Sequence, residues 1–267
     1  MTTAPTSQNP PDRSTNYHYL GLAGAHTILT NASQETYANL VTTLKANGGN
    51  GAMMCVHGGV GLGKTFAVNL HLDELAPHTT LRVKLSSAKL QALREALYKK
   101  LDLPGEPPDR ITRCENMIRA ALSEGPRVLV VDEAQWLDTR AFEFIRELWD
   151  DENTRFAVVL VGAENCYQKI KKRPALESRI LLWQRYTPLT PTEVLTTIPQ
   201  YHPIWTGRSA DDLLWIDDLA CHGNFRQWAR VTYLLQEAMD TPPYPAYSRD
   251  LVRAVFSRLD PTSRHAT

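Results

Sequence analysis

The 267-residue sequence lacks several patterns that would assign it to a specialised class of protein. Its four cysteines are widely separated and form no C-x-x-C pair, which excludes the usual zinc spacings and disfavours a disulfide framework. Its unbroken apolar runs, such as Ala157–Val161, are far shorter than the roughly 20 residues that a membrane helix needs. No basic and then apolar leader opens the sequence. We therefore expect a cytoplasmic protein without a membrane partner.

An excess of charge of one sign is also missing. Lys and Arg total 29, as do Asp and Glu, so the net charge does not indicate a nucleic-acid partner. The charges are unevenly placed, because acidic residues gather in 132–152 and basic residues in 165–185. Hydrophobic residues make up 43% of the sequence, which is sufficient for a sizeable core and argues against overall disorder.

Apolar runs alternate with segments of helical spacing as far as residue 161. The runs 52–56, 127–131 and 156–161 predict strands buried on both faces, and 81–85 predicts another strand. The segments before, between and after them have helical spacing, and the helix before the first strand could be capped by Asn31 or Ser33. This order predicts an α/β fold, in which a parallel sheet carries helices on both faces.

The pattern changes after Pro188. Thr190 and Glu193 form a capping box, and beyond them only helical spacing appears. We therefore predict a flexible N-terminal tail over 1–16, an α/β core over 17–189, and a small helical lid domain with a C-terminal tail over 190–267.

A glycine-rich segment follows the first predicted strand. Gly58-x-x-x-x-Gly63-Lys64-Thr65 matches the P-loop pattern in full, between an apolar strand and a helix. Glycines let backbone N–H groups close around phosphate oxygens, and the next helix points its positive end at them. Lys64 would reach the β- and γ-phosphates, and the Thr65 hydroxyl would bind Mg²⁺. The predicted phosphate-binding residues are Gly58, Gly59, Val60, Gly61, Leu62, Gly63, Lys64, Thr65 and Phe66.

Two carboxylates end the buried strand 127–131. Asp132 would project into the crevice where ligands bind and would complete the Mg²⁺ sphere together with Thr65. Glu133 is placed to orient and activate an attacking water, which favours a hydrolase over a metabolic kinase.

These motifs make residues 20–240 resemble the AAA+ ATPases, and the resemblance implies that ATP is the nucleotide. In that family a polar residue after the fourth strand senses the γ-phosphate, and here Glu164 and Asn165 are both candidates. An arginine before the last core strand reaches a neighbouring subunit's nucleotide, and Arg179 matches it. Gly223-Asn224-Phe225-Arg226 resembles the second sensor, which makes Arg226 the residue that contacts the phosphates from the helical domain. The alternative for Arg179 is a surface ion pair with Glu177 or with a partner on an acidic face, and the alternative for Arg226 is an ordinary exposed arginine.

The sequence is similar to the transposition ATPases of the Mu B, TniB and TnsC type in its compact core and short helical domain, in the Val-Val-Asp-Glu-Ala-Gln segment 130–135 and in the Val-Gly-x-x-Asn turn 161–165. This resemblance implies an ATP-dependent homo-oligomer that binds duplex DNA through its backbone and selects target DNA for a transposase. The alternative is a nucleotide switch that acts on protein partners only, as in the ExeA-like secretion or signalling proteins. The candidate DNA contacts, which could equally be solvated surface lysines, are Lys84, Lys89, Arg94, Lys99, Lys100 and the cluster Lys169–Arg173.

Overall fold

The structure is a computed structural model that describes residues 21–84, 87, 89–243 and 245–259. The predicted tail 1–16 lies outside these residues. The chain divides into two compact units. The α/β unit contains Leu29–Glu193 and His222–Phe225. The helical unit contains the described residues before Leu29, the segment Val194–Cys221 and the described residues from Arg226 onward.

The α/β unit contains a five-stranded sheet in the order β2-β3-β4-β1-β5, with every neighbouring pair parallel. The strands are β1 Met53–Gly58, β2 Thr80–Val83, β3 Arg127–Val131, β4 Phe156–Val161 and β5 Ile180–Tyr186. All six residues of β1 and all six of β4 are buried, because these strands lie inside the sheet and are covered on both faces. The predicted α/β fold with a parallel sheet is confirmed.

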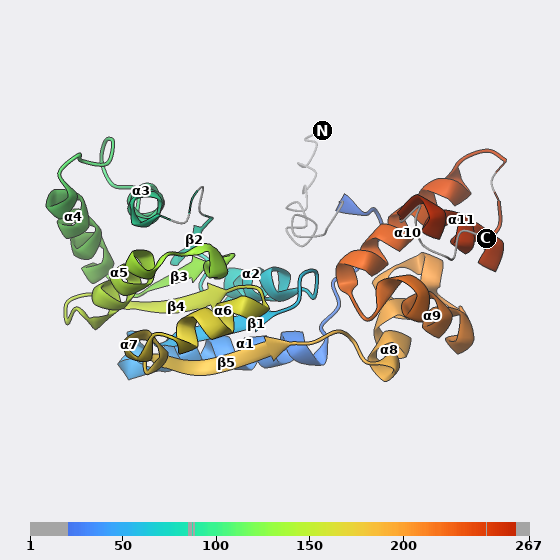
Figure 1. The fold of residues 1–267 in the computed structure, drawn as a ribbon, viewed down its shortest axis with the longest axis horizontal. Helices are drawn as coiled ribbons and strands as arrows, with labels where there is room; N and C mark the ends of the chain where they lie inside the picture. Colours follow the sequence, from blue (N-terminus) through green and yellow to red (C-terminus); the bar gives the residue numbers. More distant parts are fainter. Residues whose placement is uncertain (1–20, 85–86, 88, 244, 260–267) are drawn as a thin grey trace, which may run out of the picture. The chain divides into compact units, whose positions relative to one another are not determined.

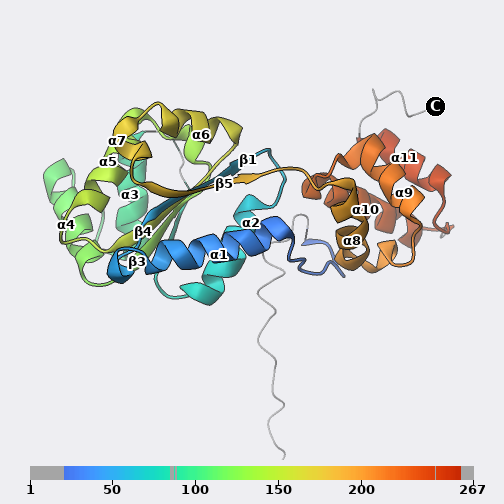
Figure 2. The same cartoon turned by 90° about the horizontal axis from the view of Figure 1, so that it is seen from below.

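Helices cover both faces of this sheet (Figures 1 and 2). They are α1 Asn31–Lys45, α2 Lys64–Leu75, α3 Leu90–Lys100, α4 Ile111–Ser123, α5 Thr139–Asp150, α6 Glu164–Lys171 and α7 Pro174–Glu177. One core layer packs α1 and α2 against alternate residues of β1, β3 and β4, such as Val56 and Val161. The other layer packs the remaining five helices against the intervening residues, such as Cys55 and Leu160. Alternation along each strand therefore gives two separate apolar cores.

The start of α1 differs from the expected cap. Neither Asn31 nor Ser33 caps this helix, because Thr30 holds the extended N-cap conformation and its hydroxyl accepts the Ser33 N–H at 3.2 Å. The physical preference is the same, since threonine, like serine and asparagine, can accept a hydrogen bond from an N–H of the first turn.

Parallel pairing brings three loops to one edge of the sheet. Val56 of β1 lies beside Val161 of β4, and Val131 of β3 lies beside Leu160 of the same strand. The segments that leave the carboxyl ends of β1, β3 and β4 therefore start next to one another. Ligands of parallel α/β sheets bind at this edge.

The helical unit contains most of α8 Pro191–Tyr201, α9 Ala210–Ile216, most of α10 Phe225–Asp240, and α11 Arg249–Leu259. Its core includes Trp205 and Trp228, whose rings meet edge to face at 5.3 Å. The Trp205 indole donates to the Thr232 hydroxyl at 2.9 Å, so the buried N–H is satisfied. At the start of α8 the Thr190 N–H donates to the Glu193 carboxylate at 2.9 Å, and the Glu193 N–H donates to the Thr190 hydroxyl at 3.3 Å, which confirms the capping box.

No helix among the described residues combines the length and apolarity needed to cross a bilayer.

Candidate nucleotide-binding site

The P-loop joins β1 to α2 and depends on glycine where the backbone is crowded or left-handed. Gly58 has φ 141°, and a Cβ there would lie 2.3 Å from the carbonyl oxygen of Tyr186. Gly63 has φ 95° and occupies the N-cap of α2, where no side chain caps the first turn. A helix N-terminus of this kind favours an anion.

The Lys64 side chain folds over the loop that precedes it. Its ammonium donates to the carbonyl oxygens of Gly58 at 2.9 Å and Gly59 at 2.6 Å, and the side chain is largely buried. A cation is thereby held directly above the glycine-rich loop. Polyphosphate oxygens bound in the loop would accept from the same ammonium, so the local geometry fits the predicted phosphate contact.

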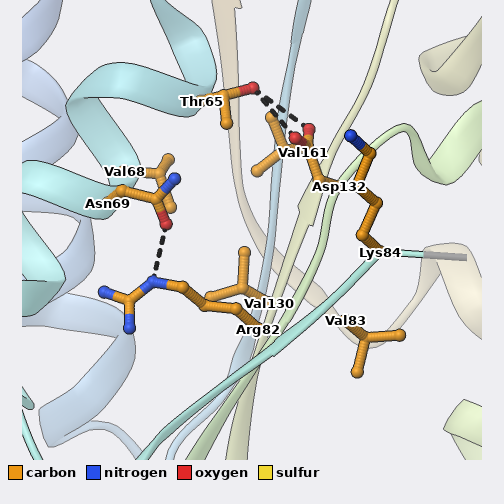
Figure 3. Close-up of a pocket in the computed structure, with 9 residues that line it drawn as sticks. All are labelled: Thr65, Val68, Asn69, Arg82, Val83, Lys84, Val130, Asp132 and Val161. Atoms are coloured by element: carbon orange, nitrogen blue, oxygen red, sulfur yellow. Dashed lines mark hydrogen bonds between the residues drawn. The ribbon is translucent and has the colours of Figure 1, made fainter. Parts of the chain in front are cut away.

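The structure brings the two predicted magnesium ligands together. The Thr65 hydroxyl, in the first turn of α2, donates to the Asp132 carboxylate at 3.1 and 3.3 Å (Figure 3). Burial raises the pKa of Asp132 above its ordinary value, although the hydrogen bonds from Thr65 and from the Glu133 N–H oppose that effect. A hydroxyl and a partly desolvated carboxylate are the hard oxygen donors that Mg²⁺ takes. The residues therefore fit the cation, and its binding here stays a prediction.

A small pocket opens on the β2 side of this pair. Lys84 lies exposed at the end of β2 and lines the pocket together with Thr65 and Asp132 (Figure 3). Arg82 lines it too, but its guanidinium is held on α2 by Asn69 at 2.8 Å and Asp73 at 2.5 Å. Among the candidate DNA contacts, Lys84 is the one that lines this pocket.

Glu133 follows Asp132 in a left-handed backbone conformation, with φ 55°. This conformation is uncommon for a residue with a side chain, and it turns the chain sharply after β3. The Glu133 N–H donates to Asp132 at 2.9 Å, and the Glu133 carboxylate accepts from the side-chain amide of Gln135. The candidate catalytic carboxylate is therefore held by Gln135, which was not among the predicted site residues.

The loop after β4 contains the two candidates for the first sensor. Glu164 pairs with Arg185 at 2.9 Å and lies 3.8 Å from Nδ1 of His57. His57 immediately precedes the P-loop, and its burial lowers its pKa. Asn165 is exposed beside Glu164. His57 was not among the predicted site residues, since nothing in the local sequence signals a contact with residue 164. The choice between the two sensors stays open.

Arg179 lies at the opposite edge of the sheet from the P-loop. The next residue, Ile180, pairs with Met53 of β1. Gly58 lies five residues further along β1, so roughly 16 Å separates Met53 from the P-loop glycine at the usual rise per residue of a strand.

The Arg179 guanidinium donates to Asp150, at the end of α5, at 2.5 Å. Burial alone would raise the pKa of Asp150, but the hydrogen bonds and charges of Arg179 and Arg146 hold it below its ordinary value. The surface ion pair that was one of two alternatives for Arg179 is therefore present. A role in a neighbour's site stays a prediction.

The Gly223–Phe225 segment of the second-sensor motif groups with the α/β unit. The Asn224 side chain donates to the Val60 carbonyl in the P-loop at 2.7 Å. Gly223 has φ 68° and accepts the Leu189 N–H at 2.9 Å, and a Cβ at this glycine would lie 2.4 Å from the Leu189 carbonyl oxygen. This motif therefore touches the phosphate loop through Asn224. Arg226 belongs to the helical unit, and its contact with phosphate stays a prediction.

Several candidate DNA contacts are engaged within the protein instead. Arg94 pairs with Glu115 at 2.5 Å, and Lys171 pairs with Glu177 at 2.5 Å. Lys169 donates to the Gln135 carbonyl, and Arg173 donates to the Thr139 hydroxyl at 2.8 Å. The exposed lysines that remain from this set are Lys84, Lys89, Lys99, Lys100 and Lys172.

The sheet order, the P-loop at the end of β1 and the carboxylates at the end of β3 define a fold of the AAA+ P-loop class. Residues 47–170 match the sequence model of a family described as an AAA domain. A comparison with curated proteins found no match by sequence.

Solved structures share this fold at low sequence identity. The Aeropyrum pernix ORC2 protein, in ADPNP–ADP complexes, has a TM-score of 0.70 and 16% identity over 94% of this chain and 72% of that one. Cdc6p from Pyrobaculum aerophilum has a TM-score of 0.72 and 17% identity over 88% of this chain and 69% of that one. The Aeropyrum pernix ORC1 protein in complex with DNA has a TM-score of 0.66 and 13% identity over 89% and 66%. At these identities the similarity shows the fold.

Proposed function

We propose that this chain binds ATP with Mg²⁺ and hydrolyses it to ADP and phosphate. The observation that carries the proposal is the meeting of the Lys64 ammonium, the Thr65 hydroxyl and the Asp132 carboxylate at the carboxyl edge of the sheet. These groups match, one for one, the cation, the hydroxyl and the carboxylate that P-loop NTPases use for phosphate and magnesium. The AAA domain match and the ADPNP–ADP complexes of ORC2 support the same nucleotide.

In this proposal each residue has a separate task. Lys64 and the N–H groups of the loop bind the β- and γ-phosphates, while Thr65 and Asp132 hold the cation. Bound Mg²⁺ would neutralise charge on the phosphate oxygens. Glu133 takes a proton from the attacking water, and Arg179 of a neighbouring copy stabilises charge that develops on the γ-phosphate.

Loss of nucleotide binding is the first test. We expect Lys64→Ala to lose uptake of labelled ATP, because it removes the cation that neutralises the β- and γ-phosphates. Filter retention of radiolabelled ATP measures this, with circular dichroism as a check of folding. Lys45→Ala, at the exposed end of α1, is the matched control and should bind as the wild type does. Equal uptake by the wild type and Lys64→Ala would contradict the proposal.

We further propose that the ATP-bound protein assembles on duplex DNA and delivers target DNA to a transposase. The likeness in fold to ORC1, solved in complex with DNA, supports the DNA partner, and the motif resemblance to the Mu B, TniB and TnsC type supports transposition. Lys89, Lys99 and Lys100 are exposed cations that could neutralise backbone phosphates.

Salt dependence tests the DNA contact. We expect ATP-dependent retention on long duplex DNA. The slope of the logarithm of the DNA-binding constant against the logarithm of the salt concentration should become shallower by about 0.9 for each backbone phosphate that a substitution leaves without its cation. The double variant Lys99→Ala/Lys100→Ala should show this change in a fluorescence-anisotropy titration. Lys171→Ala is the control, because Lys171 is already paired with Glu177. A slope that does not change in the double variant would remove these lysines from the interface.

The alternative is a nucleotide switch for protein partners only. It is favoured by the zero net charge and by the internal pairing of Arg94, Lys169, Lys171 and Arg173. Absence of ATP-dependent retention on DNA at low salt would select this alternative.

A further inference from the structure

Gln135 joins the candidate catalytic carboxylate to the loop that follows β4. Its side-chain amide donates to the Glu133 carboxylate, and its side-chain oxygen accepts the Ala163 N–H at 2.9 Å. We propose that Gln135 is a positioning residue that orients Glu133 and links its orientation to that loop. This inference rests on the proposed ATP hydrolysis.

The side-chain amide of Gln135 supplies both the donor and the acceptor that this bridge needs. Glu133 as a carboxylate can only accept, and the Ala163 N–H can only donate, so the residue between them must offer one donor and one acceptor. Glutamate at position 135 would keep the acceptor and lose the donor. Alanine would lose both. The hydrogen bond to Glu133 can therefore be removed alone, or both hydrogen bonds can be removed together.

The surroundings of Gln135 hold the amide in place. Gln135 is only 5% exposed, and hydrogen bonds are stronger where water is excluded. Gly162, at the end of β4, has no room for a side chain, because a Cβ there would lie 2.8 Å from the Gln135 side-chain oxygen and 2.5 Å from Cβ of Cys166. From α6, Lys169 donates to the Gln135 backbone carbonyl. Both the side chain and the backbone of Gln135 are thus held by the segment after β4.

This link gives Glu133 a mechanical connection to the nucleotide sensor. Glu164 and Asn165, the two candidates for the first sensor, directly follow Ala163. A nucleotide-dependent shift of that loop would move the Ala163 N–H, and the amide would carry the shift to the Glu133 carboxylate. Proton abstraction requires the base within hydrogen-bond reach of the water, so small displacements of Glu133 change the rate of hydrolysis.

Steady-state kinetics separates this role from a structural one. We expect Gln135→Ala and Gln135→Glu to lower kcat by about 10- to 100-fold, since a displacement on the order of 1 Å in a catalytic group costs up to about 10²-fold. The KM for ATP should change little, because Lys64, Thr65 and Asp132 are intact. Gln184→Ala is the matched control, since this buried glutamine also makes two side-chain hydrogen bonds, to Thr36 at 3.0 Å and Ala32 at 2.8 Å. It should lower the melting temperature and leave kcat unchanged.

The Ala163 amide resonance reports the second half of the bridge without reference to activity. In ¹⁵N spectra it should shift in Gln135→Ala and stay near its wild-type position in Gln135→Glu, which retains the acceptor. If the wild type hydrolyses ATP and Gln135→Glu keeps the wild-type kcat, this inference is overturned while the proposed function stands. An Ala163 amide resonance that does not shift in Gln135→Ala would overturn it in the same way. A wild type with no ATPase activity would overturn the proposed function together with this inference.

Discussion

Arg179→Ala is expected to lower ATP turnover by about 10³–10⁵-fold while ATP binding survives, which is the range that an arginine directed at the γ-phosphate contributes in P-loop enzymes. The reason is geometric. Arg179 precedes β5 at the amino edge of the sheet, and the P-loop of the same chain leaves the carboxyl edge. We therefore expect the guanidinium to serve the nucleotide of another copy. Turnover per subunit should rise with protein concentration, and a constant value on dilution would contradict a role between copies.

Release of Arg179 from its own chain should cost little. It pairs with Asp150, and both side chains are 27% exposed, so the pair contributes about 0–1 kcal/mol, as surface ion pairs generally do. Arg146 also pairs with Asp150, at 2.7 Å, so this carboxylate would still have a cationic partner when Arg179 contacts another copy. Arg146→Ala is therefore the matched control on the same face. It should keep most of the wild-type turnover.

Mixing two inactive variants tests the direction of this contact. Lys64→Ala retains the arginine and lacks the site, whereas Arg179→Ala retains the site and lacks the arginine. In a head-to-tail assembly with random mixing, about a quarter of the interfaces would combine an intact site with an intact arginine. An equimolar mixture should regain roughly that share of activity, and no recovery would argue that Arg179 acts within its own chain or on stability alone.

The sheet could be predicted from the sequence because its strands carry their own signal. The predicted strands 127–131 and 156–161 agree with β3 and β4, since both are short apolar runs buried on two faces. The first strand was placed at 52–56 and extends to Gly58, because the P-loop glycine still pairs with Tyr186 of β5. The phosphate motif was visible for a similar reason, since its glycines and Lys64 lie within one short segment.

Contacts between distant segments could not be predicted in this way. Gln135 and Ala163 are 28 positions apart, and Asn224 and Val60 are 164 apart, so only the folded chain brings them together. The partners of Arg94 and Lys171 were hidden for the same reason. Basic residues in the sequence look identical whether their side chains face solvent or nearby carboxylates, and here Arg94 and Lys171 face carboxylates.

Glu133→Gln is the second change with a large expected effect. It keeps the size of the side chain and removes the base, so turnover should fall by about 10²–10⁴-fold, the usual contribution of general base catalysis. ATP binding should persist, because the phosphate and magnesium ligands are untouched. Asp138→Asn is the matched control, since Asp138 caps α5 by accepting the Ala141 N–H at 2.7 Å and asparagine caps equally well.

Glu133→Gln should also hold the protein in its ATP-bound state. If ATP drives assembly and hydrolysis ends it, this variant should remain on duplex DNA after a chase with unlabelled competitor, while the wild type dissociates as its ATP is consumed. Negative-stain electron microscopy with ATP would show the persistent assemblies directly. A Glu133→Gln protein that turns over ATP at the wild-type rate would move the catalytic base elsewhere, and the bridge through Gln135 would then orient a carboxylate that does not take part in the chemistry.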